Sequence, residues 1–443
     1  MIRRWLTVLL AALALAGCGG GGGGSGSGVQ ATASPTPTPT GTGTPVANTA
    51  TLLVDGGPAA LSTGANGYAA LNEGYITITL CAPGSTTNCQ TIDHVQVDTG
   101  SVGLRVIRGV LQPSLLAALP EETDPSGNPV GECYQYVSSY AFGSVRLADF
   151  TVAGEKVAAM PVQVVADAGV FTTVPANCSS GGGSAITSIQ DLGANAIIGI
   201  GSTATDCGTL CQTAGSNAGA AYYSCPATGC ASIIARTAAT TAPFEQLPNP
   251  VAAFASDNNG VIITLPQVAS TGVASTSGTL TFGIGTQSDN LLPSGLTLLA
   301  LTTSTATRGP ALVTANYKGN ALSQSFLDTG SSTYYFDDGT ITACTSGTWT
   351  DFYCPAAPLL LSPTLTGTNN VTATASFTLY NPTTLAATVN VAPGLGVDTA
   401  LLTQASLSSN SFDFGLPFFF GRTVYSAIEG RDAGGTTGPY VAF

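Results

Sequence analysis

An aspartate followed by Thr-Gly-Ser occurs twice in the chain, each time at the end of an apolar run. The first copy is "HVQVDTGSVGLRV", which contains Asp98, and the second is "SQSFLDTGSSTYYF", which contains Asp328. Each copy is followed much later by an apolar element with a glycine, "ANAIIGIG" around Gly199 and "FDFGLPFFFG" around Gly415. One copy could be a simple turn, because Asp, Thr, Gly and Ser are common turn residues. Two matching copies predict two duplicated lobes that face each other.

Short runs rich in Val, Ile, Thr, Tyr and Phe, separated by Gly, Asn, Pro and Ser, make up the chain from about Thr51 onward. Such runs are typical of strands and turns, so we expect an all-β fold. Only "VLQPSLLAALPEE" and "APFEQLPNPVAAFAS" favour short helices. With 443 residues, of which 44% are hydrophobic, the chain is too long for one simple core. We expect an N-terminal lobe over residues 51–288 with Asp98 and a C-terminal lobe over residues 289–443 with Asp328.

The chain carries few cations. Its net charge is −13, with 11 Lys and Arg residues, which argues against nucleic-acid partners and against electrostatic binding to anionic membranes. Two lysines (Lys156 and Lys318) and one histidine (His94) leave little room for a Ser-His-Asp triad or a multi-histidine zinc site. We expect no metal and no cofactor, and we interpret His94 as a hydrogen-bonded strand residue. The run "GIGSTA" at Gly199 matches a dinucleotide fingerprint, but no βαβ alternation accompanies it.

The N-terminus has the features of an export signal. Two arginines precede the apolar run "WLTVLLAALALAGC", which is shorter than the roughly 20 residues that a transmembrane helix needs. The end of residues 1–18, Leu-Ala-Gly-Cys, resembles the bacterial lipobox, in which Cys18 is lipidated; an ordinary signal peptide is the alternative. Gly19 after that cysteine implies sorting to the outer membrane. Residues 19–50, rich in Gly, Ser, Pro and Thr, are expected to form a disordered tether.

Ten cysteines remain after Cys18, an even number that favours five disulfides in an exported chain. The pairs Cys81–Cys89 and Cys344–Cys354 are isolated in the sequence, and Cys133 is expected to pair with Cys178. A cluster of four cysteines should form two more disulfides, with a zinc site as the alternative; its members are Cys207, Cys211, Cys225 and Cys230.

The duplicated motif, with its later apolar-glycine elements, resembles the pepsin-like, bilobal aspartic proteases, and more narrowly a little-characterised bacterial lipoprotein branch of them. The resemblance covers nearly all of the chain after the tether. It implies two β-barrel-like lobes with an interlobe cleft, in which each lobe contributes one Asp-Thr-Gly loop. It also implies an aspartic-type endopeptidase, acting on peptide or protein substrates as a monomer and held at the membrane only by its N-terminal lipid.

Two aspartates brought within about 3 Å of each other cannot both ionise cheaply, so one proton is shared. We expect Asp98 and Asp328 to form this dyad and to activate a water molecule for direct attack on a peptide carbonyl. The other motif residues are expected to support the two loops. The glycines would allow tight turns, the threonines would cross-link the loops, as the resemblance implies, and the serines would orient the outer carboxylate oxygens: Gly100 and Gly330, Thr99 and Thr329, Ser101 and Ser331.

The resemblance also implies a flap that closes over the substrate. "YAFGSVRLADFTVAG" is similar to the flap hairpin and would make Tyr140 the flap tyrosine, with Ala141 in place of a glycine. In active members an aromatic residue braces that tyrosine, whereas Arg105 stands at the matching position here. Arg105 could instead be a paired, partly buried arginine, and Tyr140 a core aromatic. The altered brace motivates a second hypothesis, a catalytically weak or inactive envelope protein that binds peptide or glycan.

Overall fold

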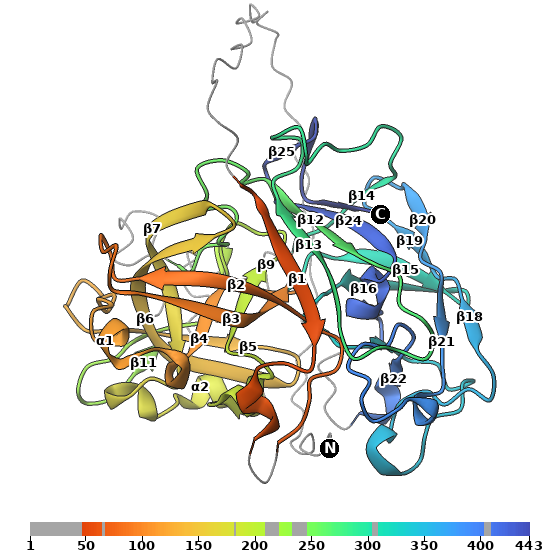
Figure 1. The fold of residues 1–443 in the computed structure, drawn as a ribbon, viewed down its shortest axis with the longest axis horizontal. Coiled ribbons are helices and arrows are strands. Elements are labelled where there is room, and N and C mark those ends of the chain that lie inside the picture. Colours follow the sequence, from red (N-terminus) through yellow and green to blue (C-terminus); the bar gives the residue numbers. More distant parts are fainter. Residues whose placement is uncertain are drawn as a thin grey trace, which may run out of the picture.

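The computed structural model describes residues 47–63, 67–180, 183–208, 221–232, 246–303, 309–402 and 409–443. Within these residues strands dominate, and helices are single short turns. Figure 1 shows two lobes side by side, one built from the first part of the chain and one from the last, with β1, β12, β13 and β24 between them. The all-β, bilobal fold that the resemblance implied is confirmed by this architecture.

The described residues form short helices and strands in a fixed order along the chain. The segment up to Phe282 contains β1 (Thr49–Asp55), β2 (Glu73–Cys81), β3 (Cys89–Asp98), β4 (Val102–Ile107), α1 (Pro113–Leu116), β5 (Val130–Gln135), β6 (Ser139–Val152), β7 (Glu155–Val165), α2 (Ala176–Ser179), β8 (Ser184–Ile186), α3 (Ile189–Leu192), β9 (Ala196–Ile200), β10 (Tyr222–Ser224), β11 (Ala231–Ser232), β12 (Gly260–Leu265) and β13 (Thr276–Phe282). The second half contains β14 (Leu298–Ala300), β15 (Val313–Tyr317), β16 (Asn320–Leu327), β17 (Tyr334–Phe336), β18 (Leu359–Leu361), β19 (Thr364–Thr366), β20 (Thr372–Thr374), β21 (Phe377–Leu379), β22 (Gly396–Asp398), β23 (Asp413–Phe414), β24 (Arg422–Ala427), β25 (Asp432–Ala433), β26 (Thr436–Thr437) and β27 (Tyr440–Ala442).

One large sheet connects the two lobes. Its strand order runs from β11 through β10, β5, β6, β7, β4, β9, β3 and β2 to β1, and continues through β13 and β12 to β24, β27 and β14. β24, near the end of the chain, therefore hydrogen-bonds over six residues to β12, which belongs to the segment expected to form the first lobe. This shared sheet fixes the position of one lobe relative to the other.

The same strand arrangement occurs under both Asp-Thr-Gly-Ser loops. In the first lobe β9 lies between β3, to which it is parallel, and β4, to which it is antiparallel, and Gly199 lies opposite Asp98. In the second lobe β23 lies in the same way between β16 and β17. The glycine of each inserted strand is required by space. A Cβ on Gly199 would lie 2.5 Å from the backbone nitrogen of Val102, and one on Gly415 would lie 2.1 Å from the carbonyl oxygen of Thr333.

Disulfides hold the loops of both lobes. The expected pairs Cys81–Cys89, Cys133–Cys178 and Cys344–Cys354 are present. In the four-cysteine cluster Cys225 bonds to Cys230, and Cys207 is also disulfide-bonded, whereas Cys211 lies outside the described residues. The disulfide interpretation of this cluster therefore holds for the cysteines that the structure describes.

Two local expectations need correction. The second expected helix is absent from its described part, residues 246–256, because Pro248 and Pro250 restrict the backbone and the Asn249 side chain bonds instead to Gly201 and Thr203 carbonyls. The first strand begins at Thr49, two residues inside the segment expected to be tether. The signal segment with Cys18 and the rest of the tether lie outside the described residues and stay predictions. No helix among the described residues is long and apolar enough to cross a membrane.

A buried pair of carboxyl groups joins the start of β7 to the segment before β12. Glu155 is 3% exposed and Asp257 is 1% exposed, and their side chains share a hydrogen bond. Asp257 also accepts hydrogen bonds from Gln287, at 2.5 Å, and from Thr286. Burial, together with the hydrogen bond to Asp257 and its charge, raises the pKa of Glu155 to about 7. The folded protein therefore holds a proton here that the unfolded chain releases at lower pH.

We expect this pair to make the protein less stable as the pH rises. Because the folded pKa of Glu155 lies above its ordinary value of 4.5, its contribution is complete below that pH and is lost as the pH rises through about 7. Glu155→Gln keeps a hydrogen-bond donor without a charge, so its melting temperature should fall less between pH 5 and about 8 than that of the wild type. Calorimetry with Glu121→Gln, at a partly exposed position, provides the control. Parallel curves for wild type and Glu155→Gln would contradict the prediction.

Candidate active site

Asp98 and Asp328 lie side by side where the two lobes meet. A Cβ on Gly100 would lie 2.7 Å from a carboxyl oxygen of Asp328, and one on Gly330 would lie 2.7 Å from Asp98 Oδ1. The two carboxyl groups also share a hydrogen bond. Each motif therefore needs its glycine, because any side chain there would collide with the carboxyl group of the opposite lobe. The structure brings together the two aspartates that the sequence repeat singled out.

The two threonines of the motifs bind the loops to each other. The backbone N–H of Thr99 donates to Thr329 Oγ1 at 3.1 Å, and the N–H of Thr329 donates to Thr99 Oγ1 at 3.0 Å. Each hydroxyl then donates across to the strand before the opposite motif, from Thr99 to the carbonyl of Leu327 at 3.2 Å and from Thr329 to that of Val97 at 2.7 Å. The expected cross-link between loops is therefore present, and it fixes the carboxyl groups relative to each other.

The two aspartates receive different numbers of hydrogen bonds. Asp98 Oδ1 accepts from the backbone N–H groups of Gly100, at 2.7 Å, and Ser101, at 3.2 Å, and Asp98 Oδ2 accepts from the Ser101 hydroxyl. Asp328 Oδ1 accepts from Gly330 at 2.7 Å, and its Oδ2 accepts from the Ser331 hydroxyl at 3.0 Å. Donors stabilise the charged form of a carboxyl group. Because Asp328 has fewer donors, this difference favours the protonated form at Asp328.

The electrostatic environment of Asp328 agrees with this assignment. Burial raises the pKa of Asp328 well above its ordinary value, and the negative charges of Asp98 and Asp413 raise it further. The hydrogen bond from Gly330 has the opposite, smaller effect. The pair can therefore carry one proton over a wide pH range, with a carboxylate and a carboxylic acid side by side.

Two more carboxyl groups lie close to the dyad, and the sequence analysis did not identify them. Glu73 accepts a hydrogen bond from Gln96, which lies two residues before Asp98, and Asp413 accepts one from Ser331 at 2.6 Å. Burial and the charge of Asp98 raise the pKa of both groups well above their ordinary values. The sequence could have indicated Asp413, because this acid interrupts the apolar run "FDFG". The equivalent run in the first lobe, "AIIG", contains no acid.

The hairpin of β5 and β6 corrects the expected flap tyrosine. Gln135 pairs with Tyr140, so the hairpin turn comprises residues 136–139, and Tyr136 N donates to the carbonyl of Ser139 at 2.8 Å. Tyr140 lies beyond the turn on β6, pairs with Ala185 and packs beside the core around the Cys133–Cys178 disulfide. The expectation failed because the Tyr-x-x-Gly-Ser pattern gave the wrong hairpin register.

Tyr136 is the tyrosine at the end of this hairpin. Its pKa is raised well above the ordinary value, first by burial, with a further contribution from the charge of Asp98, while Arg105 acts in the opposite direction. Its hydroxyl is buried and has no hydrogen-bond partner among the described residues. Tyr136, rather than the expected Tyr140, is therefore the tyrosine of this hairpin on which the charges of both Asp98 and Arg105 act.

Arg105 is a buried structural ion pair, which was one of the two interpretations of this residue. It is fully buried, and its guanidinium forms a bidentate pair with Glu132, through Nη2 at 2.7 Å and Nε at 3.2 Å. Its Nη2 lies 3.5 Å from Asp206, its Nη1 donates to the Val102 carbonyl, and the group stacks over the Tyr134 ring at 3.9 Å. Burial lowers the pKa of Arg105, but the charge of Glu132 and its hydrogen bond, together with the charges of Tyr136 and Asp206, raise it overall. Arg105 therefore links β4 to the flap strand β5.

The remaining candidates lie apart from this chemistry. His94 has a positive φ of 46° at an irregularity in the β2–β3 pairing, and its Nε2 lies 3.4 Å from Asp55 Oδ2, as expected for a hydrogen-bonded strand residue. Gly199 belongs to the strand that crosses under the first loop. Among the described residues no group of His, Cys, Asp and Glu side chains has the arrangement of a metal site.

Comparisons with known proteins give a family and a set of similar solved structures. A family model described as "Protein of unknown function (DUF3443)" matches residues 44–443. The crystal structure of an aspartic proteinase from Irpex lacteus is similar at a TM-score of 0.47 and 14% sequence identity, covering 86% of this chain and 93% of that one. No curated protein matches the chain.

We expect Arg105 to be needed for stability. Arg105→Met leaves Glu132 buried without its cation, which should lower the free energy of unfolding by about 3–5 kcal/mol in urea titrations. The double variant Arg105→Met/Glu132→Leu should recover part of this loss, because it removes the uncompensated charge as well. Arg108→Met is the matched control, since the side chain of Arg108 is 44% exposed and its pairing with Asp167 should contribute only about 0–1 kcal/mol. Equal losses in the two single variants would contradict the prediction.

Proposed function

The chain belongs to a family of proteins of unknown function (DUF3443), so its activity has to be argued from the site, and we propose that it is an aspartic-type endopeptidase. The observation that carries the proposal is the pair Asp98 and Asp328, which share a hydrogen bond on two loops that are cross-linked by Thr99 and Thr329. Two carboxyl groups held in contact can take up and give back a proton without help from a metal or a histidine.

The reaction follows from the different environments of the two aspartates. Asp98, with three donors on its oxygens, acts as the carboxylate that removes a proton from a bound water molecule. Asp328 holds the other proton and donates it to the oxygen of the scissile carbonyl as the water oxygen attacks the carbon. Asp98 then passes the proton that it took from water to the amide nitrogen, and Asp328 takes one proton back from a hydroxyl group of the tetrahedral intermediate. The C–N bond breaks to give a carboxylic acid and an amine, and the pair again carries a single proton. No covalent intermediate with the protein forms.

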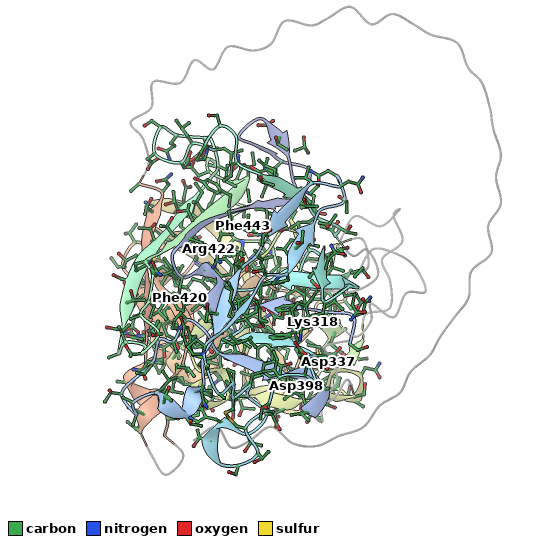
Figure 2. The ribbon with its side chains drawn as sticks, turned by 90° about the vertical axis from the view of Figure 1, so that its right-hand side faces the viewer. Lys318, Asp337, Asp398, Phe420, Arg422 and Phe443 are labelled. Carbon is green, nitrogen blue, oxygen red and sulfur yellow. A yellow bond between two sulfur atoms is a disulfide. The ribbon has the colours of Figure 1, made fainter. Side chains whose placement is uncertain are left out.

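Replacing either aspartate tests this proposal. Asp98→Asn and Asp328→Asn should each lower kcat/KM for peptide cleavage at least about a hundredfold, because each removes one partner of the proton transfer. Asp398→Asn is the matched control: Asp398 is a buried aspartate on the second lobe that caps Ala400, and asparagine can also serve as such a cap. Figure 2 labels Asp398 and Asp337 in the second lobe, and the charge of Asp337 acts on Asp398. Wild-type cleavage by either dyad variant, with the fold checked by circular dichroism, would disprove the assignment.

The hairpin tyrosine provides a second test. When the hairpin closes on a substrate, the free hydroxyl of Tyr136 can form a hydrogen bond that it lacks in this structure. Tyr136→Phe should therefore lower kcat about tenfold, the cost of one such bond, whereas Tyr140→Phe should stay within about twofold of the wild type. Steady-state kinetics on one peptide compare the two variants directly. A larger loss in Tyr140→Phe would restore Tyr140 as the functional residue.

A protein that binds peptide or glycan without cleaving it is the second candidate. The observation in its favour is that Arg105 is fully engaged by Glu132 and Val102, so it leaves the Tyr136 hydroxyl without a brace. A peptide-library digest from acidic to neutral pH, with and without a statine-type transition-state mimic, separates the two. Cleavage that the mimic blocks supports the endopeptidase, whereas binding without cleavage at every pH supports the second candidate.

A further inference from the structure

Asp413 is a buried acid directly under the second catalytic loop. It lies on β23 between Phe412 and Phe414, whose rings stack at 4.3 Å in the core of the second lobe. Side chains alternate along a strand, so Asp413 points to the opposite side, toward Ser331. It is 1% exposed. The equivalent residue in the first lobe is Ile197, since Ile197 pairs with Gln96 as Asp413 pairs with Phe326. The acid therefore belongs to one lobe only.

Ser331 has one hydroxyl proton and two carboxyl groups within reach. Its Oγ lies 3.0 Å from Asp328 Oδ2 and 2.6 Å from Asp413 Oδ2. A hydroxyl group can donate only one hydrogen bond, so the two acids compete for it. The corresponding hydroxyl in the first lobe, that of Ser101, donates to Asp98. The duplication of the motif therefore conceals a difference in how the two catalytic carboxyl groups are held.

Among the residues that the structure describes, the surroundings of Asp413 contain acids and a tyrosine but supply no cation. Asp328 and Asp98 face it from the two loops, and Tyr335 faces it from β17, where Tyr335 pairs with Asp413 in the sheet. Glu73 acts on the same tyrosine. No group that acts on Asp413 is positive, and its Oδ1 has no hydrogen-bond partner among the described residues. Ionisation of Asp413 is therefore stabilised mainly by the Ser331 hydroxyl.

We propose that Asp413 is a positioning residue of the dyad: by competing with Asp328 for the single Ser331 proton, it keeps the shared proton on Asp328 and extends the working range of the dyad toward neutral pH. The inference rests on the proposed endopeptidase function. When Asp413 ionises, it accepts the hydrogen bond from the Ser331 hydroxyl. Asp328 then loses this donor and gains a negatively charged neighbour. Both effects make Asp328 harder to ionise. Three carboxyl groups linked in this way release their last proton at higher pH than two would.

The pH profile of kcat/KM tests the role in catalysis. Asp413→Asn keeps the shape without the charge, and Asp413→Ile reproduces the first lobe. In both, the alkaline limb should move to lower pH by on the order of one unit, a tenfold loss at a fixed pH on that limb, while the acidic plateau stays within about twofold. Asp398→Asn, the buried control, should keep the wild-type limb. An alkaline limb that stays in place in both Asp413 variants overturns the proposal.

A second measurement does not depend on activity. Melting temperatures of wild type, Asp413→Asn, Asp328→Asn and the double variant, taken from acidic to neutral pH, form a double-mutant cycle. Asp413→Asn should gain stability relative to wild type as the pH rises, and the gain should be smaller in the Asp328→Asn background. Equal gains in both backgrounds would show that the two acids are independent and would overturn the proposal. If the wild type cleaves no peptide, the proposed function fails, and this cycle alone decides whether Asp413 acts on Asp328.

Discussion

The hydrogen bonds between the two Asp-Thr-Gly-Ser loops are the interaction on which the rest of the structure depends. Asp98 and Asp328 repel each other whenever both are ionised, so they stay together only if the backbone holds them. Thr99 and Thr329 hold the loops together, because each threonine hydroxyl forms two hydrogen bonds with the backbone of the opposite lobe. The large sheet that connects the two lobes also helps to hold the two loops in place relative to each other. Because the two loops approach so closely, no side chain fits between them, and glycine is needed in each loop and in the strand inserted beside it.

The two lobes are duplicated in backbone but not in chemistry. Ser101 serves one carboxyl group, whereas Ser331 lies between two, because Asp413 replaces Ile197 under the second loop. The hairpin with Tyr136 and the buried Arg105–Glu132 pair belong to the first lobe. A repeat of backbone geometry therefore brings the two acids together, and residues outside the repeat give them different roles. The proposed reaction depends on this difference, because in it one aspartate acts as the base while the other keeps its proton.

Sequence reasoning identified those parts of the site that local motifs encode. The dyad and its threonine cross-link could be found because each loop is a continuous motif present twice. Three disulfides followed from the isolation or order of their cysteines. Tyr136 was missed because a hairpin's register depends on which residues form the turn, and "QYVSSYAFGS" allows more than one turn. The second expected helix does not form in its described part, because two prolines and the side chain of Asn249 favour an irregular backbone. Glu73 was missed because nothing near it in sequence marks its position.

By itself, the sequence determined an all-β chain with two equivalent lobes, an acidic composition with little histidine or lysine, and two aspartates on glycine-containing loops. These are properties of residue type and spacing along the chain. Only the tertiary structure decided which tyrosine lies at the hairpin end, that Arg105 is committed to Glu132, and that Asp413 and Asp328 share one hydroxyl. The physical reason is that burial and shared hydrogen bonds depend on groups far apart in sequence, such as Ser331 and Asp413, which meet only when β23 enters the sheet between β16 and β17.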